Sequence, residues 1–336
     1  MTIMKKSLSL LCSLCISVLV FADGLTATLQ QGDEMTPFYG VDAFKEAYQA
    51  ADSGAVITLS VGSFNPSITP IEKSLTIIGA SAMQSDDQYN TNLTHITIVA
   101  DNVTIEGVKF SNLVNLGNIK NCHIKRSYLT ILGSLNDSSY HTNTIVEQSY
   151  VNREEAIKTG INYCIRNSYI EVFYTNNKVN NMAYITNCYI NNFFGGSGRE
   201  PYAIYKKNIL YHGYSGTTLS SDRVFYVSSP SEFYDNVIFY YSYKYSSSKT
   251  YTYKLKSSSG TIFLNNFEVA STHTTTASGI PRPTTYLASD STYIGPAGGI
   301  GVSDYPAIPR IVNKSIDSNT DSGGKLNISI TVKAEK

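Results

Sequence analysis

The segments VEQSYV (146–151), IRNSYI (165–170) and ITNCYI (185–190) repeat one six-residue pattern. Each has an apolar residue, two variable residues, a small polar residue, one variable residue and a second apolar residue. Each unit is also rich in Ile, Val and Tyr, which are typical of strands. The same pattern starts at five further positions, namely Val103, Ile119, Tyr205, Phe233 and Ile262.

The spacing of the units indicates a solenoid. Successive units start 16, 27, 19, 20, 20, 28 and 29 residues apart. A step near 20 residues with occasional insertions is typical of stacked coils whose extra residues loop out. No helix-period segment separates the units, which argues against a βαβ fold. We therefore predict an all-β chain, a right-handed single-stranded parallel β-helix of about eight or nine coils.

The fourth residue of each unit is expected in a tight turn, with its side chain inside the coil. Stacked Asn side chains can hydrogen-bond along the axis there, and Ser or Cys can fill the same space. Glu106 occupies this place in the first unit and fits it poorly. The predicted structural turn ladder consists of Cys122, Ser149, Ser168, Cys188, Asn208, Asn236 and Asn265.

The sequence divides into three segments. Residues 1–22 read as a signal peptide, 23–275 as the β-helix, and 276–336 as a Gly- and Pro-rich loop with capping strands, which is not an independent domain. The stretch VDAFKEAYQAA (41–51) has helical apolar spacing and is expected to cap the N-terminal end of the solenoid. Ile328, Ile330 and Val332 alternate with polar residues, which predicts a strand covering the far end.

The N-terminus predicts the compartment. Lys5 and Lys6 precede an apolar run at 8–20, and Val20-Phe21-Ala22 ends it. This arrangement is typical of a secretory signal cleaved after Ala22, so we expect a secreted, periplasmic or cell-surface protein. No other stretch is long and apolar enough to span a membrane.

Composition narrows the function classes. The chain has 26 basic and 26 acidic residues, so its formal net charge is zero, and only 15% of its residues are charged. A chain with no net charge has no overall positive electrostatic potential that would attract a phosphate backbone, so nucleic acid is not an expected partner. The histidines and cysteines lack metal-ligand spacing, so we predict no metal site and no cofactor. The sequence does not predict an oligomeric state.

Three stretches resemble the pectin-lyase-like superfamily of secreted β-helix proteins. They are DAFKEAYQAADSGAVITLSVGSF (42–64), ITPIEKSLTIIGA (68–80) and ITIVADNVTIEGVKFSN (96–112). The tail PRIVNKSIDSNTDSGGKLNISITVKA (309–334) is similar to tails on secreted β-helix proteins of gut-type Bacteroidetes. The resemblance implies the parallel β-helix fold and a polysaccharide partner.

The known chemistry of that superfamily does not carry over residue by residue. Its lyases use clustered acidic residues for calcium with an Arg opposite them, and no Arg of these coils has a matching pair of Asp residues. The motifs of the polygalacturonases and pectin methylesterases are also missing. The sequence therefore assigns no catalytic residue, and fold alone does not imply function.

Tyrosines form the candidate binding site. The position after the turn slot should face outward, and it reads His123, Tyr150, Tyr169, Tyr189, Ile209 and Val237 in successive units. Sugar rings stack on aromatic faces, so we expect Tyr150, Tyr169, Tyr189 and the nearby Tyr211 to bind substrate. The alternative is an aromatic ladder that only stabilises parallel strands.

The tract from Tyr240 to Ser259 is rich in Tyr, Ser and Lys. It predicts a protruding hairpin, with an adhesive surface loop as the sharper alternative.

Two functions fit these patterns. The first is a secreted β-helix protein that engages polysaccharide, with lyase or hydrolase activity left open. The second is a non-catalytic cell-surface structural or adhesin-like protein. A cleft with carboxylates that converge with an Arg or Lys on adjacent coils would favour an enzyme, and a smooth Tyr stripe without such convergence would favour binding or structure.

Overall fold

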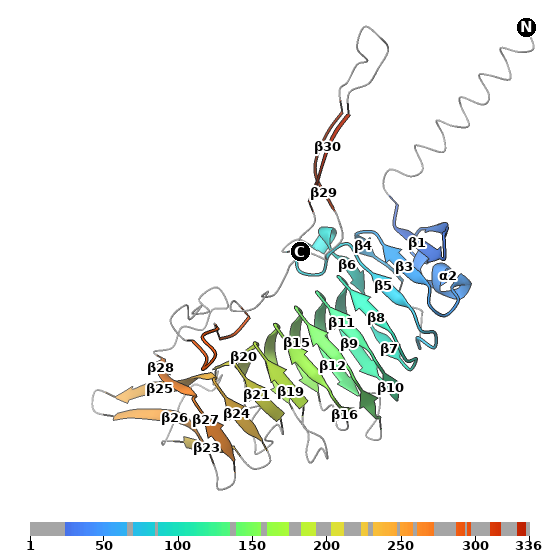
Figure 1. Ribbon diagram of the computed structural model, residues 1–336. Coiled ribbons are helices and arrows are strands. Elements are labelled where there is room, and N and C mark those ends of the chain that lie inside the picture. The colour runs from blue at the N-terminus through green and yellow to red at the C-terminus, as the bar shows by residue number, and fades with distance from the viewer. Residues whose placement is uncertain are drawn as a thin grey trace, which may run out of the picture.

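The chain is a parallel β-solenoid (Figure 1). The computed structural model describes residues 24–65, 70–84, 87–134, 139–155, 160–174, 183–192, 203–211, 223–227, 231–246, 249–257, 261–271, 287–292, 294–296, 310–316 and 328–333. The predicted signal peptide at 1–22 lies outside these residues. None of the helices in the described ranges has the length and hydrophobicity needed to cross a lipid bilayer.

The first of two large sheets has 12 strands. In spatial order they are β2 (Glu34–Tyr39), β1 (Thr26–Gln31), β3 (Val56–Leu59), β5 (Thr76–Ile78), β8 (Thr104–Glu106), β11 (His123–Lys125), β14 (Ile145–Glu147), β17 (Cys164–Arg166), β19 (Ala183–Thr186), β21 (Ala203–Lys206), β24 (Glu232–Tyr234) and β27 (Ile262–Leu264).

The second large sheet has 13 strands. Its main path is β23 (Arg223–Val227), β26 (Lys249–Ser257), β25 (Val237–Ser246), β22 (Ile209–Tyr211), β20 (Tyr189–Asn192), β18 (Tyr169–Tyr174), β15 (Tyr150–Glu155), β12 (Tyr128–Ser134), β9 (Lys109–Leu116), β6 (Thr91–Leu93) and β4 (Gly62–Ser63), with β28 (Phe267–Ser271) on β25 and β7 (Ile96–Ile98) on β9. A short third sheet contains β10 (Ile119–Lys120), β13 (His141–Thr142) and β16 (Gly160–Ile161).

The predicted fold class is confirmed, and the coil count differs slightly from the eight or nine predicted. In the described part of the first sheet, the ten strands from β3 to β27 stack in parallel. The two additional strands are β3 and β5, which stack as coils although they lack the six-residue pattern.

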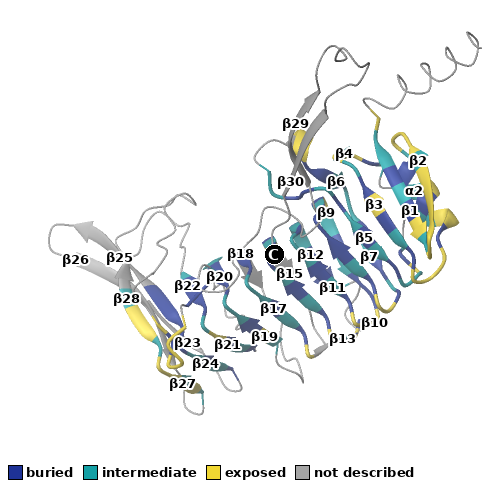
Figure 2. Cartoon of the chain, turned by 45° about the horizontal axis from the view of Figure 1, so that its top comes forward, coloured by how far each residue is buried: buried dark blue, intermediate teal, exposed yellow. Residues whose placement is uncertain are grey.

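The core is a column of apolar side chains inside the coils. Figure 2 shows buried residues in the strands of successive coils. The middle residue of each short strand in the first sheet faces inward because side chains alternate along a strand. These residues are completely buried, and each contributes about 1.5–3 kcal/mol of transfer free energy. They include Ile57, Ile77, Ile105, Ile124, Val146, Ile165, Ile185, Tyr205 and Phe233.

From β8 onward, each coil turns a corner between the two large sheets with one residue in the left-handed backbone region. These corner residues are Gly107, Arg126, Gln148, Asn167, Asn187, Lys207, Asp235 and Asn265. The next residue faces inward and forms what we call the inward row. The inward row consists of Val108, Ser127, Ser149, Ser168, Cys188, Asn208, Asn236 and Asn266.

The inward row links neighbouring coils through hydrogen bonds. The side-chain oxygen of Ser149 accepts the amide N–H of Ser127 at 3.2 Å, and Asn236 Oδ1 accepts the amide N–H of Asn208 at 2.9 Å. Asn236 Nδ2 also donates to the carbonyl of Tyr205 at 2.9 Å. The row therefore satisfies buried backbone groups that would otherwise cost free energy.

Two members of the predicted turn ladder lie elsewhere. Cys122 is buried, but it follows Asn121 at a different corner, between β10 and β11. Asn265 is a corner residue itself, and Asn266 takes the inward place. Both errors have one cause. The six-residue patterns that start at Ile119 and Ile262 do not coincide with the structural repeat, in which Ile124 and Phe263 are equivalent to Val146 and Phe233.

The N-terminal end is closed by the predicted capping helix, α2 (Ala43–Ala50). Ala43, Phe44 and Ala47 are buried against the first coils. Lys73 Nζ donates to the carbonyls of Tyr48, Gln49 and Ala51, at 2.9, 3.2 and 2.7 Å. The lysine thus donates to carbonyls at the C-terminal end of the helix, where Tyr48 O also accepts from Ala51 N at 3.3 Å.

Part of the C-terminal region packs on the outside of the second large sheet. Ala288 and Ile294 are buried against Ile209, Val237 and Phe239. The segment is fixed at Asp235, which accepts hydrogen bonds from Ser289 N and Oγ at 3.0 Å each.

A glycine fits this segment to the sheet. Gly295 has a φ of +88°, and a Cβ atom there would lie 2.5 Å from Ile209 Cδ1. A larger residue would therefore force the Ile209 side chain to shift and would be strained at this φ.

The predicted C-terminal strand exists but does not extend the solenoid. β30 (Ile328–Lys333) pairs with β29 (Arg310–Ile316) in a two-stranded antiparallel sheet of its own. The alternation of apolar and polar residues predicted strand β30 correctly, but it did not predict the pairing with β29.

We expect Asn236→Ala to destabilise the protein by about 2–4 kcal/mol, because it leaves buried amide and carbonyl groups without partners. Urea unfolding followed by circular dichroism measures this change. The matched control is Asn112→Ala, at an exposed position of β9, which should change stability by less than about 0.5 kcal/mol. Equal effects at the two positions would contradict the proposed role of the inward row.

Candidate functional site

Four tyrosines stack face to face along the outside of the second large sheet. The rings of Tyr128, Tyr150, Tyr169 and Tyr189 lie with centroids 4.7, 4.8 and 5.0 Å apart and with interplanar angles of 6°, 7° and 16°. Parallel pairing places the same position of each coil beside its neighbour, and so it produces this stack. Lys109 Nζ lies 5.3 Å from the Tyr128 ring centroid at one end.

This geometry is the aromatic ladder that the sequence left open as the alternative. The rings of the stack cover one another, and Tyr169 and Tyr189 are 8% and 5% exposed. Tyr150, Tyr169 and Tyr189 therefore offer ring edges rather than faces to a sugar in this structure. Tyr211 lies further along the sheet, where its ring is tilted by 51° against Phe239.

The sequence missed Tyr128 as a member of the stack. The unit starting at Ile119 placed His123 in the outward row, whereas the structure pairs Tyr128 with Tyr150. His123 belongs to the first large sheet instead, opposite Thr104 and Ile145.

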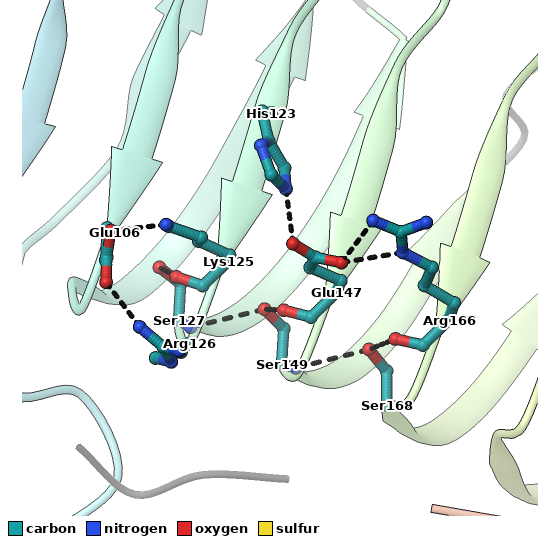
Figure 3. Close-up of polar contacts among 9 residues, drawn as sticks. All are labelled: Glu106, His123, Lys125, Arg126, Ser127, Glu147, Ser149, Arg166 and Ser168. Atoms are coloured by element: carbon teal, nitrogen blue, oxygen red, sulfur yellow. Dashed lines mark hydrogen bonds and ion pairs between the residues drawn. The ribbon is translucent and has the colours of Figure 1, made fainter. Parts of the chain in front are cut away.

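Charged side chains converge on the outer face of the first large sheet (Figure 3). We call this group the charge network. It spans the four consecutive strands β8, β11, β14 and β17, and it consists of Glu106, His123, Lys125, Arg126, Glu147 and Arg166.

Each carboxylate of the charge network has two partners. Glu106 Oε2 lies 2.9 Å from Lys125 Nζ, and its Oε1 lies 2.7 Å from Arg126 Nη1. Glu147 Oε1 lies 2.8 Å from His123 Nε2, and its Oε2 accepts from Arg166 Nε at 2.6 Å. With a neutral histidine, three cations face two carboxylates.

The charge network keeps Glu147 ionised. Burial alone would raise the pKa of this carboxyl, but the hydrogen bonds and charges of Arg166 and His123 outweigh burial and hold the pKa below its usual 4.5. Glu147 is therefore a poor general acid near neutral pH. It can orient His123 and accept hydrogen bonds.

An exposed tyrosine lies beside the charge network on the next coil. Tyr184 in β19 is 43% exposed and is opposite Cys164 and Ile204 in the register of the sheet. Thr186 and Lys206 continue the row of Glu147 and Arg166. The outer face thus has an aromatic residue beside a row of polar and charged groups.

Sequence reasoning missed the charge network and Tyr184. Sequence spacing alone does not place Glu147 beside both His123 and Arg166, since these residues come from three coils. Within the part of the chain that the structure describes, no group of three His, Cys, Asp or Glu side chains could hold a metal ion.

No family model matches this chain, and no curated protein sequence or solved structure matches it either.

We expect Tyr169→Ala to destabilise the protein by about 3–5 kcal/mol, because it removes a buried ring from the middle of the stack. Tyr169→Phe should cost only about 1 kcal/mol, through loss of the hydrogen bond from the hydroxyl to Glu171. Thermal unfolding of both variants, with exposed Tyr140→Ala as the control, measures the difference. Unchanged stability in Tyr169→Ala would contradict a structural role for the stack.

We expect Arg166→Gln to raise the pKa of Glu147 and to destabilise the protein by about 1 kcal/mol at pH 7, since Arg166 is partly exposed. A carboxyl whose folded pKa is lowered contributes stability above its unfolded pKa and loses that contribution as the pH falls. Variant and parent should therefore converge in stability near pH 3.

Carboxyl titration by NMR and urea unfolding at both pH values provide the test. Lys206→Gln, at an exposed position of β21, serves as the control. An unchanged Glu147 pKa in Arg166→Gln would contradict the coupling.

Proposed function

We propose that this chain is a secreted β-helix protein of the pectin-lyase-like type that engages polysaccharide through the outer face of its first large sheet. One observation carries the proposal: the charge network converges on four adjacent coils, with exposed Tyr184 on the next coil. Carboxylates and cations on one outer face can form hydrogen bonds with the hydroxyl and acidic groups of a sugar chain.

The chemistry of this face suits a sugar chain. The ring of Tyr184 can stack on the apolar face of a pyranose. Arg166, Lys206 and Thr186 can donate hydrogen bonds to hydroxyl or acidic groups, and Glu147 can accept them. These groups follow the solenoid axis with one coil per step of about 4.8 Å, so an extended chain could contact several coils in succession.

The network favours binding over catalysis. Both carboxylates are already paired with cations, and the lowered pKa of Glu147 disfavours general acid chemistry. The pair of His123 and Glu147 is the one arrangement in the charge network with geometry for proton transfer, at 2.8 Å. A lyase or hydrolase activity would therefore depend on His123.

The second candidate is a non-catalytic cell-surface structural or adhesin-like protein. The same ion pairs favour it, because each one joins neighbouring coils and stabilises the solenoid without any ligand. The proposed export, with signal cleavage after Ala22, is common to both candidates and is tested by sequencing the N-terminus of the mature protein.

The deciding experiment is a glycan array with the mature protein, followed by assays for reducing sugars and unsaturated products. We expect binding to at least one polysaccharide, and Tyr184→Ala should weaken it by about tenfold. Tyr140→Ala is the matched control, since Tyr140 is 40% exposed and lies beside the third sheet. His123→Gln tests any turnover.

No binding and no turnover across plant, host and microbial glycans would reject the proposal. Binding that is lost equally in Tyr184→Ala and Tyr140→Ala would place the site elsewhere.

A further inference from the structure

A short segment crosses the outside of the second large sheet over β22 and β25. We call it the strap, and it consists of residues 287–292 and 294–296. In the described part of the chain, no strand of either large sheet includes residues of the strap. The strap is therefore joined to the coils without the ladder of backbone hydrogen bonds that joins one coil to the next.

Two successive corner residues hold the strap through their charged side chains. Lys207 Nζ donates to Asp290, and also to Thr292 Oγ1 at 2.9 Å. Asp235 accepts hydrogen bonds from the amide and the hydroxyl of Ser289. The two preceding coils have Asn at this corner, and Asn adopts the left-handed backbone region far more readily than Lys does. The change from Asn to Lys and Asp therefore coincides with the place where the strap crosses.

Hydrogen bonds within the strap maintain its shape. Ala288 N donates to Thr292 O at 2.8 Å, and Ser291 N donates to Ala288 O at 2.9 Å. Asp290 Oδ1 accepts from Thr292 N at 3.2 Å and from Thr292 Oγ1 at 2.6 Å. These bonds do not involve the coils, so they can persist when the strap leaves the sheet. The strap can therefore move as one unit.

The strap covers an apolar strip in line with the tyrosine stack. In the register of the sheet, the row of stacked tyrosines ends at Tyr189 and continues with Ile209 and Val237, which form the apolar strip. Ile209 is 2% exposed and Val237 is completely buried. Both lie in one buried cluster with Ala288 and Ile294 of the strap. Removal of the strap would therefore expose the strip to solvent.

The contacts that hold the strap are more open to water than those between coils. The side chain of Asp290 is 53% exposed, so dissolved salt screens its ion pair with Lys207. The coils are joined instead by buried backbone bonds, such as the one from Val237 N to Asn208 O at 2.9 Å. Local opening begins in segments with few buried contacts and exposed hydrogen bonds. We therefore expect the strap to open before the coils do.

We propose that the strap is a releasable cover. It leaves the sheet as one unit while the coils stay folded, and its departure uncovers the apolar strip beside the tyrosine stack. A ligand of that strip binds only the open state, so the closed fraction lowers its apparent affinity. This device lies on the second large sheet and is independent of the proposed glycan site on the first.

Amide hydrogen exchange on the full chain, followed by NMR, measures the opening. The amides of Ser289 and Gly295 donate from the strap to the coils, whereas those of Ile209 and Val237 donate from coil to coil. We expect the two strap amides to exchange about tenfold or more faster than the two coil amides. Added salt should accelerate the strap amides alone, because it screens the ion pair.

Two kinds of variant open the strap by different routes. Asp290→Asn and Lys207→Gln remove the ion pair, and Lys206→Gln is the matched control because it removes the same charge one residue away. Gly295→Ala leaves every charge in place, but its Cβ would lie 2.5 Å from Ile209 Cδ1 at a φ of +88°. Each opening variant should accelerate exchange of the strap amides by about tenfold. It should also bind more anilinonaphthalene sulfonate, a dye that reports exposed apolar surface.

Thermal unfolding verifies that the coils of each variant are folded. Faster exchange of the strap amides in the opening variants, with the coil amides unchanged and Lys206→Gln like the parent, would support the inference. Equal exchange of strap and coil amides in the parent would overturn it, since both would then open only together. Strap amides that are insensitive to Gly295→Ala and Asp290→Asn, an equal acceleration in Lys206→Gln, or faster strap exchange without additional dye binding would overturn it as well.

Discussion

The solenoid depends on one backbone constraint: from β8 onward, each coil places a residue in the left-handed region at the same corner. Seven of the eight corner residues are not glycine, and an L-residue costs about 1–2 kcal/mol in that conformation. Hydrogen bonds between coils offset the cost. The corner amide of Arg126 donates to the carbonyl of Glu147, and the inward row accepts further amides. A corner is therefore stable only when the next coil is present, as expected for a fold stabilised by neighbour interactions.

The corner also determines which side chains become neighbours on adjacent coils. Because register is constant, equal positions of successive coils become neighbours, and different side chains tolerate this in different ways. Aromatic rings stack like on like, as in the row from Tyr128 to Tyr189. Charges cannot do so, and the outer row reads Glu106, Lys125, Glu147, Arg166 with alternating sign. One geometry thus selects repetition for uncharged groups and alternation for ions.

The sequence predicted the fold well and the site poorly, for one physical reason. Strand content, the capping helix and most of the inward row depend on local pattern, and they could be derived from periodicity. The register of the unit at Ile119 could not, because IKNCHI (119–124) places a left-handed Asn and a small buried residue at a different corner, with the same local chemistry. That shift hid Tyr128. The charge network was invisible because its pairs join residues about twenty positions apart, such as Glu106 with Arg126.

Lys73 has a consequence for how the molecule tolerates damage. In the later coils, the inward row and the tyrosine stack repeat the same contact from coil to coil. The loss of one member leaves the other contacts of the row in place. At the C-terminal end of α2, a single amino group instead gathers three carbonyls, beside the hydrogen bonds of the Tyr48 hydroxyl with Pro70 O and Glu72 N. Chemical capture of that one amine would remove three hydrogen bonds at once, although Ala43, Phe44 and Ala47 would still be buried in the core. The contacts of Lys73 thus converge on one side chain, whereas the contacts of the solenoid are repeated from coil to coil.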